Sequence, residues 1–210
     1  MKLIIAEKPS VAKQLRDALE PLARSGGKPG LFVGYKYTFC CALGHLFTYK
    51  MPEEINKDYE KWTLDNIPFD LPKEIPLKLS DKIRKDYFAV LEKEITSNKY
   101  DEIIIATDPD REGQGIYERI RSMIKNFPNI PETRIWIDEW TPELLVQAVN
   151  NRKPNSNYQG LKDAAECRAV EDYLVGLTST RALTCKYGGF GNVISAGPVQ
   201  TPTLYMIVKR

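Results

Sequence analysis

Three carboxylates are the side chains of this sequence best suited to do chemistry. Glu7 follows the apolar run 2–6. Asp108 and Asp110 follow a second apolar run, 101–107, and a proline keeps the chain extended between the two aspartates. Residues two apart in an extended segment point the same way, so the two aspartates can converge. Because clustered carboxylates repel one another and Mg²⁺ prefers carboxylates together with water and phosphate, the pattern indicates a divalent-metal site.

Two cations stand beside these acids. Lys8 follows Glu7, and Arg111 follows Asp110. A cation next to a carboxylate either pairs with it or holds a phosphate beside a metal, and the spacing leaves both interpretations open. A simple turn at the two aspartates, with a surface acid at Glu7, is the alternative that involves no metal.

The elements around the acids predict an α/β fold with a mostly parallel sheet flanked by helices. Strands are expected at 2–6, 31–43, 101–107 and 133–137, and helices from Pro9, at 81–97, at 112–125 and from Thr141. Three consecutive isoleucines in 101–107 suit a strand that is buried on both faces. Strands that alternate with helices are typical of this fold class, whose sites lie at the carboxyl ends of the strands.

Two parts of the chain depart from this alternation. The segment 51–80 contains several prolines and no long periodic stretch, so we expect an irregular insertion. Beyond Pro154 the pattern is helical, with helices expected at 158–177, 179–186 and 201–210, and a glycine-rich loop at 188–191. We therefore expect one domain at 1–152 and the start of a helical domain at 153–210. The last residues lack a helix cap, which indicates a longer natural chain.

Composition excludes several classes of protein. Hydrophobic residues make up 42% and charged residues 28%, as in soluble globular proteins, and no apolar run approaches the ~20 residues that span a bilayer. The early carboxylate at Glu7 argues against a signal peptide. The net charge of +2 is not that of a strongly basic nucleic-acid binder. Four cysteines without a CxxC pair and a single histidine, His45, predict neither a disulfide framework nor a zinc site.

Two separated motifs carry a family resemblance. Residues 4–10, IIAEKPS, and 108–114, DPDREGQ, resemble the Toprim domain of the type IA DNA topoisomerases, in their topoisomerase III branch. Further similar segments are 39–46, 135–137, 140–142, 165–168, 172–176, 180–184 and 195–204. The resemblance covers nearly the whole chain and implies a Rossmann-like Toprim fold followed by the first part of a helical DNA-groove domain.

The resemblance also implies an activity. A type IA topoisomerase is an isomerase that cuts one DNA strand through a 5′-phosphotyrosyl link, passes a strand through the gap and reseals it. The implied metal ligands are Glu7, Asp108 and Asp110, for Mg²⁺ or alternatively Mn²⁺; the implied catalytic residues are these three with Lys8, Arg111 and Glu112. In these roles Glu7 assists proton transfer at the 3′-oxygen, Lys8 stabilises the phosphate charge, and the other two shape the acidic loop.

The helical part implies contacts with single-stranded DNA. Beside Lys8, the residues that match positions lining or supporting the strand groove are Arg168, Asp172, Arg181 and Gln200. Val170 and Pro198 stand where the family usually has arginine, so we expect weak DNA binding. No tyrosine has the sequence context of the catalytic one. The chain is therefore expected to be an N-terminal fragment that supplies the acidic site and is inactive by itself.

Several interpretations remain beside this one. The expected partners are single-stranded DNA and the rest of the topoisomerase chain, in a monomeric, cytoplasmic, nucleoid-associated protein without membrane contact. A non-catalytic Toprim-fold nucleic-acid-binding module is one alternative, and another Toprim enzyme such as a primase or nuclease is a second. A haloacid-dehalogenase-type phosphatase is disfavoured, because it would place its Asp-x-Asp after the first strand. A Rossmann dinucleotide site is disfavoured, because it would need glycines at a strand-to-helix crossover.

Overall fold

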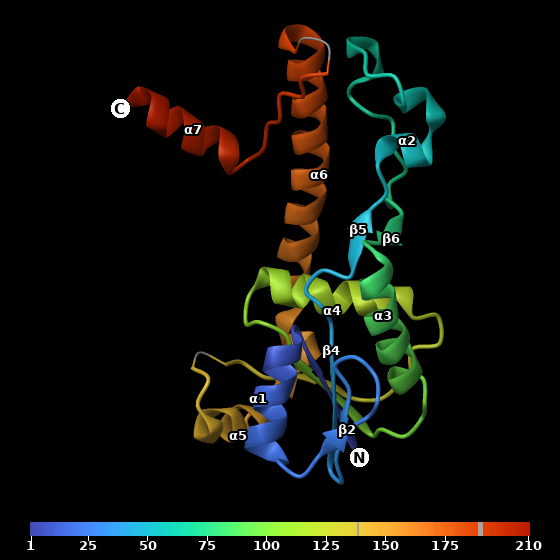
Figure 1. Cartoon of the computed structure of the whole chain (residues 1–210), viewed down its shortest axis with the longest axis vertical. Coiled ribbons are helices and arrows are strands. Elements are labelled where there is room, and N and C mark those ends of the chain that lie inside the picture. Colours follow the sequence, from blue (N-terminus) through green and yellow to red (C-terminus); the bar gives the residue numbers. More distant parts are fainter. Residues whose placement is uncertain (138, 189–190) are drawn as a thin grey trace. The chain divides into compact units, whose positions relative to one another are not determined.

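The computed structural model describes residues 1–137, 139–188 and 191–210 (Figure 1). The chain divides into two compact units: unit 1 comprises 1–48 and 79–165, and unit 2 comprises 49–78 and 166–210. These units differ from the expected domains, 1–152 and 153–210, because the segment 49–78 groups with the helical part of the chain. The domain boundary itself stays a prediction, and the loop expected at 188–191 lies partly outside the described residues.

Unit 1 is built on a seven-stranded sheet with the order β2-β3-β4-β1-β7-β8-β9. The strands are β1 (Lys2–Ala6), β2 (Arg24–Ser25), β3 (Phe32–Val33), β4 (Tyr37–Cys41), β7 (Glu102–Ala106), β8 (Glu132–Arg134) and β9 (Lys153–Pro154). The central four, β4, β1, β7 and β8, are parallel. Strands β2, β3 and β9 pair antiparallel with their neighbours, and β2 and β9 form the two edges of the sheet. The expected α/β fold with a mostly parallel sheet is confirmed.

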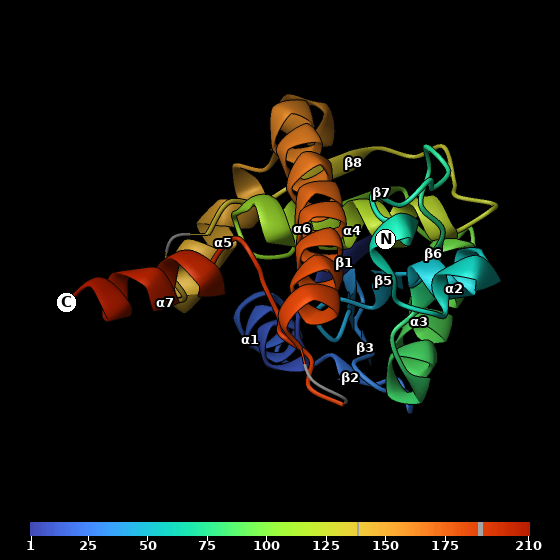
Figure 2. The same ribbon diagram turned by 90° about the horizontal axis from the view of Figure 1, so that it is seen from above.

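The helices of unit 1 cover both faces of this sheet. They are α1 (Pro9–Leu19), α3 (Lys82–Ile95), α4 (Arg111–Met123), α5 (Pro142–Asn150) and the start of α6 (Gln159–Tyr187), which follows the 3₁₀ turn η3 (Asn155–Tyr158). Helices α1 and α5 pack together on one side of the sheet, and α3 lies on the other (Figure 1 and Figure 2). All five residues of β7 are buried, which confirms the strand buried on both faces.

Local capping residues set two of the expected helix starts. The Asp81 side chain accepts a hydrogen bond from the Arg84 backbone at 2.8 Å, and the Thr141 hydroxyl accepts one from the Leu144 backbone at 3.4 Å. The two helices expected at 158–177 and 179–186 instead form the single helix α6. Neither proline nor a left-handed residue separates them, so nothing in the backbone ends the first helix. None of the helices in the described ranges is long and apolar enough to cross a membrane.

Unit 2 is held together around α6. The expected irregular segment, 51–80, contains α2 (Pro52–Ile55), the 3₁₀ turns η1 (Lys57–Tyr59) and η2 (Leu64–Asn66), and the strand β6 (Leu77–Leu79). Strand β6 pairs with β5 (Phe47–Tyr49) in a separate two-stranded sheet at the division between the units, and α7 (Gln200–Lys209) lies in unit 2. The Tyr173 hydroxyl donates to the Lys50 carbonyl at 2.7 Å. The Arg181 side chain is almost fully buried. Long-range polar contacts therefore tie the insertion to the helix.

Glu102, the first residue of β7, joins three strands and a loop by hydrogen bonds. Its carboxylate accepts bonds from Lys2, from Arg152 at 2.5 and 2.8 Å, and from the Thr133 hydroxyl at 2.6 Å. The Glu102 side chain is 9% exposed. Burial alone raises the pKa of Glu102, but the hydrogen bonds from Arg152 and Lys2 outweigh it and lower the pKa to about 2.

This carboxylate is expected to make folding sensitive to acid. Its folded pKa lies below the ordinary value of 4.5, so its stabilisation is complete above pH 4.5 and is lost as the pH falls toward 2. Such a shift corresponds to at most about 3 kcal/mol. We expect Glu102→Gln to lower the free energy of unfolding at neutral pH and to flatten its slope below pH 4.5, as measured by urea denaturation.

The control is Asp101→Asn, because that exposed carboxylate pairs only with the N-terminal amine among the described residues. It should change stability by less than about 1 kcal/mol. An unaltered acid slope in Glu102→Gln contradicts the prediction.

Candidate active site

The ends of β1 and β7 bring two of the expected acids together. In the parallel register Ala6 lies opposite Ala106, so both strands end at the same level. Glu7 follows β1 directly, and the Asp108 backbone N–H donates to Glu7 Oε2 at 3.2 Å. Because the two strands are neighbours in the sheet, acids 101 positions apart in the sequence come into contact.

Lys8 lies between these two acids. Its Nζ is 3.1 Å from Glu7 Oε1 and 3.7 Å from Asp108 Oδ2. The Glu7 side chain is 9% exposed, whereas that of Asp108 is 36% exposed. Burial raises the pKa of Asp108, and the nearby charge of Glu7 raises it further; the hydrogen bond to Glu7 raises the pKa of Lys8. The ammonium therefore neutralises part of the negative charge that a metal ion would otherwise relieve.

Asp110 has a second task at the start of α4. Its Oδ1 accepts a hydrogen bond from the Gly113 backbone at 2.7 Å, which makes it the N-cap of the helix. The negative charge of Asp110 still adds to the rise in the pKa of Asp108. Across the described residues no group of three or more His, Cys, Asp or Glu side chains is arranged to hold a metal ion. The donor set is nevertheless entirely oxygen, which fits a hard divalent cation.

A buried arginine holds the loop that carries Asp108. Arg134, at the end of β8, is fully buried and donates to the Thr107 hydroxyl at 3.0 Å and to the Asp108 carbonyl at 2.5 Å. Burial lowers its pKa. The Thr107 hydroxyl in turn donates to the Gly113 carbonyl at 2.7 Å. The sequence analysis did not single out Arg134. The pattern that could have found it is a single cation directly before an apolar stretch that contains Ile135 and Ile137.

The remaining expected residues of this region lie around the acids. Arg111 and Glu112 are exposed in the first turn of α4, and His45 Nε2 lies 3.6 Å from Glu112 Oε2. His45 follows Gly44, whose φ of +63° favours glycine and whose N–H donates to the Glu7 carbonyl at 3.1 Å. The histidine was not among the expected site residues, although it is the only one in the sequence.

The four expected DNA-groove residues all lie in unit 2. Arg168 and Asp172 form an ion pair at 3.6 Å, one turn apart on α6. Gln200, at the start of α7, donates to the Ser195 hydroxyl at 3.0 Å. Arg181 is 1% exposed and donates to Glu53 and to the Tyr59 carbonyl. Three of the four are thus open to solvent, and Arg181 is enclosed by its own unit.

Comparison with known proteins agrees with this fold. Residues 2–140 match the Toprim domain model, and residues 156–210 match a DNA topoisomerase model. The chain belongs to the Toprim domain family.

Comparison with individual proteins gives a more specific match than the domain models. The chain is 37% identical over 208 residues to a putative DNA topoisomerase 3 of Staphylococcus aureus strain bovine RF122 / ET3-1, and 36% identical to a DNA topoisomerase 3 of Staphylococcus epidermidis strain ATCC 12228 / FDA PCI 1200. Each alignment covers 99% of this chain and 28% of the relative, so the chain spans less than a third of those proteins. The resemblance to the topoisomerase III branch is confirmed.

Proposed function

We propose that this chain supplies the metal- and phosphate-binding site of a type IA DNA topoisomerase of the topoisomerase III branch. The enzyme cuts one DNA strand through a 5′-phosphotyrosyl link and reseals it, and the catalytic tyrosine belongs to protein outside these 210 residues. The observation that carries the proposal is the contact of Glu7 with Asp108 and Lys8 where β1 and β7 end. An acid pair beside a half-exposed cation suits a phosphodiester and a divalent metal together.

Each residue of this cluster has a distinct proposed role. The half-exposed Lys8 turns from the acids to the phosphate, where its charge stabilises the developing negative charge. Glu7, freed from the ammonium, gives a proton to the 3′-oxygen as it leaves during cleavage and takes that proton from the 3′-hydroxyl during resealing. Asp108 and Asp110, with Glu7 beside them, would hold Mg²⁺, or Mn²⁺ in its place. The metal, when bound, neutralises charge on the phosphate.

The first turn of α4 completes the proposed site. Arg111 and Glu112 are exposed beside the Asp110 cap, where they shape the acidic loop. His45 stands close enough to Glu112 to limit the positions of that carboxylate. Arg134 keeps the Asp108 carbonyl in place from the interior.

We place single-stranded DNA on unit 2. The partly exposed Arg168 and the exposed Gln200 are the groups that contact the strand, and Asp172 orients Arg168 through their ion pair. Arg181 is enclosed, so its proposed part is to support the helix rather than to touch DNA. Basic side chains along the backbone are typical of such grooves. The protein is proposed to act as a monomer in the cytoplasm, at the nucleoid, together with the rest of the topoisomerase chain.

A non-catalytic Toprim module is the second candidate. It is favoured by one observation: Lys8 already bridges Glu7 and Asp108, so the acids have a counter-charge without any metal. In such a module the cluster would be a structural ion pair, and divalent ions would not stabilise the fold.

Metal titration separates the two candidates. We expect Mg²⁺ to raise the melting temperature of the chain, and to raise it further when a single-stranded oligonucleotide supplies phosphate, because a ligand stabilises in proportion to its binding. Asp108→Asn and Asp110→Asn should each reduce this rise, and the double variant should abolish it. Differential scanning calorimetry with and without Mg²⁺ measures the effect.

The capping role of Asp110 allows a matched control. Asparagine is also a good N-cap, so Asp110→Asn should keep α4 intact. Asp81→Asn makes the same change at the N-cap of α3, which is not one of the proposed metal ligands, and should leave the Mg²⁺ effect unaltered. If the double variant keeps the full Mg²⁺ effect, the metal lies elsewhere. If the unaltered chain shows no effect even with DNA, the non-catalytic candidate is correct.

A further inference from the structure

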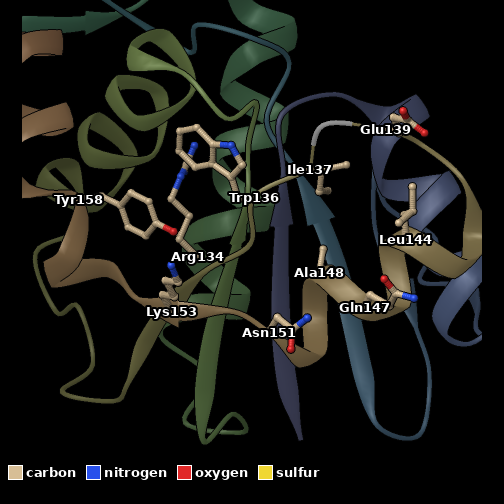
Figure 3. A pocket seen from close by; sticks show the side chains of 10 residues that line it. All are labelled: Arg134, Trp136, Ile137, Glu139, Leu144, Gln147, Ala148, Asn151, Lys153 and Tyr158. Atoms are coloured by element: carbon tan, nitrogen blue, oxygen red, sulfur yellow. The ribbon is translucent and has the colours of Figure 1, made fainter.

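A hollow of about 850 Å³ opens in unit 1 between β8 and α5 (Figure 3). Arg134, Trp136, Lys153 and Tyr158 gather at one side of it, and the α5 residues line the other. Its volume falls within the ~300–1,000 Å³ range of small-molecule sites. None of the acids of the candidate active site lines it.

Two aromatic rings form one wall of this hollow. Trp136 and Tyr158 are stacked, with ring centroids 5.7 Å apart and ring planes 6° from parallel. The Trp136 residue is nevertheless 43% exposed, so part of the indole is open to another planar group. Stacking of one base on an aromatic side chain contributes about 1–3 kcal/mol.

Arg134 brings a positive charge that forms no ion pair with any of the described residues. The side chain is fully buried, and its hydrogen bonds go to a hydroxyl and to carbonyl oxygens, with no carboxylate within ion-pair distance among the described residues. Its Nε has no hydrogen-bond partner. A buried cation in this state is stabilised by an anion that enters beside it. The exposed Lys153 adds a second cation at the same side.

We propose that this hollow binds a nucleotide, as a site separate from the acid cluster. The base extends the stack at Trp136, and the phosphate lies near Arg134 and Lys153. The side-chain amides of Gln147 and Asn151 line the α5 side and offer donors and acceptors to the edge of the base. The ligand is either a free nucleotide or one nucleotide of a single strand, since the recognised chemistry is the same.

Calorimetric titration with EDTA present tests this site without involving any metal. The probes are thymidine monophosphate, thymidine, inorganic phosphate and a thymidine octamer, each added to the 210-residue chain. We expect the monophosphate to bind more tightly than thymidine or phosphate. Trp136→Leu should weaken its binding about tenfold, within the range of one lost base stack. Lys153→Gln should weaken the monophosphate but leave thymidine unchanged, because only the phosphate meets that cation.

Trp140→Leu is the matched control for the tryptophan change. Trp140 is 37% exposed, close to the exposure of Trp136, but does not line the hollow, so its replacement should leave binding unchanged. Thermal melting checks that each variant folds; Lys153→Gln alters an exposed side chain and keeps the test open if Trp136→Leu unfolds.

The two sources of nucleotide give different results. If Trp136→Leu weakens the octamer as much as the monophosphate, the ligand is part of a strand; if it weakens the monophosphate alone, the ligand is free. Both results support the site. The proposal is overturned if neither probe depends on Trp136 and Lys153, if phosphate binds as well as the monophosphate, or if no nucleotide binds, which would leave the hollow to a protein partner. Because EDTA is present, none of these results depends on the proposed metal site.

Discussion

Replacing Gly113 by alanine is expected to destabilise unit 1 by about 3 kcal/mol, the upper part of the range for overpacking in a rigid interior. A Cβ at this position would lie 2.2 Å from the Asp108 carbonyl oxygen and 2.8 Å from the Asp108 nitrogen. Both atoms are backbone, so no side chain can rotate away. The loop must therefore shift, and Arg134, which holds the same carbonyl, must shift with it.

Urea denaturation of Gly113→Ala and Gly160→Ala measures this effect. Gly160 is exposed in the first turn of α6, and a Cβ there meets nothing within 4 Å. Alanine is the better helix former, so Gly160→Ala should be neutral or stabilise by up to about 1 kcal/mol. The Mg²⁺-dependent rise in melting temperature should also fall in Gly113→Ala only. Equal stability of the two variants would show that the loop accommodates the methyl group.

Replacing Arg181 by methionine is expected to destabilise unit 2 by about 2–3 kcal/mol, the cost of losing the hydrogen bonds of a buried guanidinium to the partly exposed Glu53 and to a backbone carbonyl. Its guanidinium donates to Glu53 Oε2 at 2.5 Å and to the Tyr59 carbonyl at 2.6 Å. It also lies 4.9 Å from the ring centroid of Trp62 and 4.8 Å from that of Phe69. Methionine fills similar space but leaves the carboxylate and the carbonyl without their donor.

Arg168→Met is the matched change on the same helix. Arg168 pairs with Asp172 at 3.6 Å on a solvated face, where such pairs contribute less than about 1 kcal/mol. Unfolding of the two variants can be followed by circular dichroism and by the fluorescence of Trp62. If Arg181→Met costs no more than Arg168→Met, the Arg181 network does not hold the insertion to α6.

Neighbouring residues in the sequence were sufficient to predict the elements that position the acids. The apolar runs before Glu7 and Asp108 form β1 and β7, and the helices expected at 81–97 and from Thr141 form α3 and α5. Helix capping and strand burial depend on residue types a few positions apart, so both can be predicted from the sequence. The break expected near residue 178 was wrong: no proline stands there, and Gly176 keeps a helical backbone within α6.

The arrangement within the site depended on contacts between residues far apart in the sequence. From the sequence spacing, Lys8 could be either an ion-pair partner or a phosphate ligand. In this structure the register of β1 with β7 brings Lys8 beside Asp108, so it is an ion-pair partner. The spacing of Asp108 and Asp110 predicted that their carboxylates point to the same place. In the structure one oxygen of Asp110 instead accepts a hydrogen bond from a backbone N–H in the first turn of α4, where such groups have no partner within the helix.

The partners of the buried arginines were decided by tertiary packing. By itself the sequence determined the α/β class, the acids at the strand ends and the family resemblance. Only the tertiary structure placed Arg134 beneath the Asp108 loop and enclosed Arg181 against the insertion 49–78. The physical reason is that a buried guanidinium takes its partners from segments brought together by packing, and no local pattern specifies which carbonyls or carboxylates those will be.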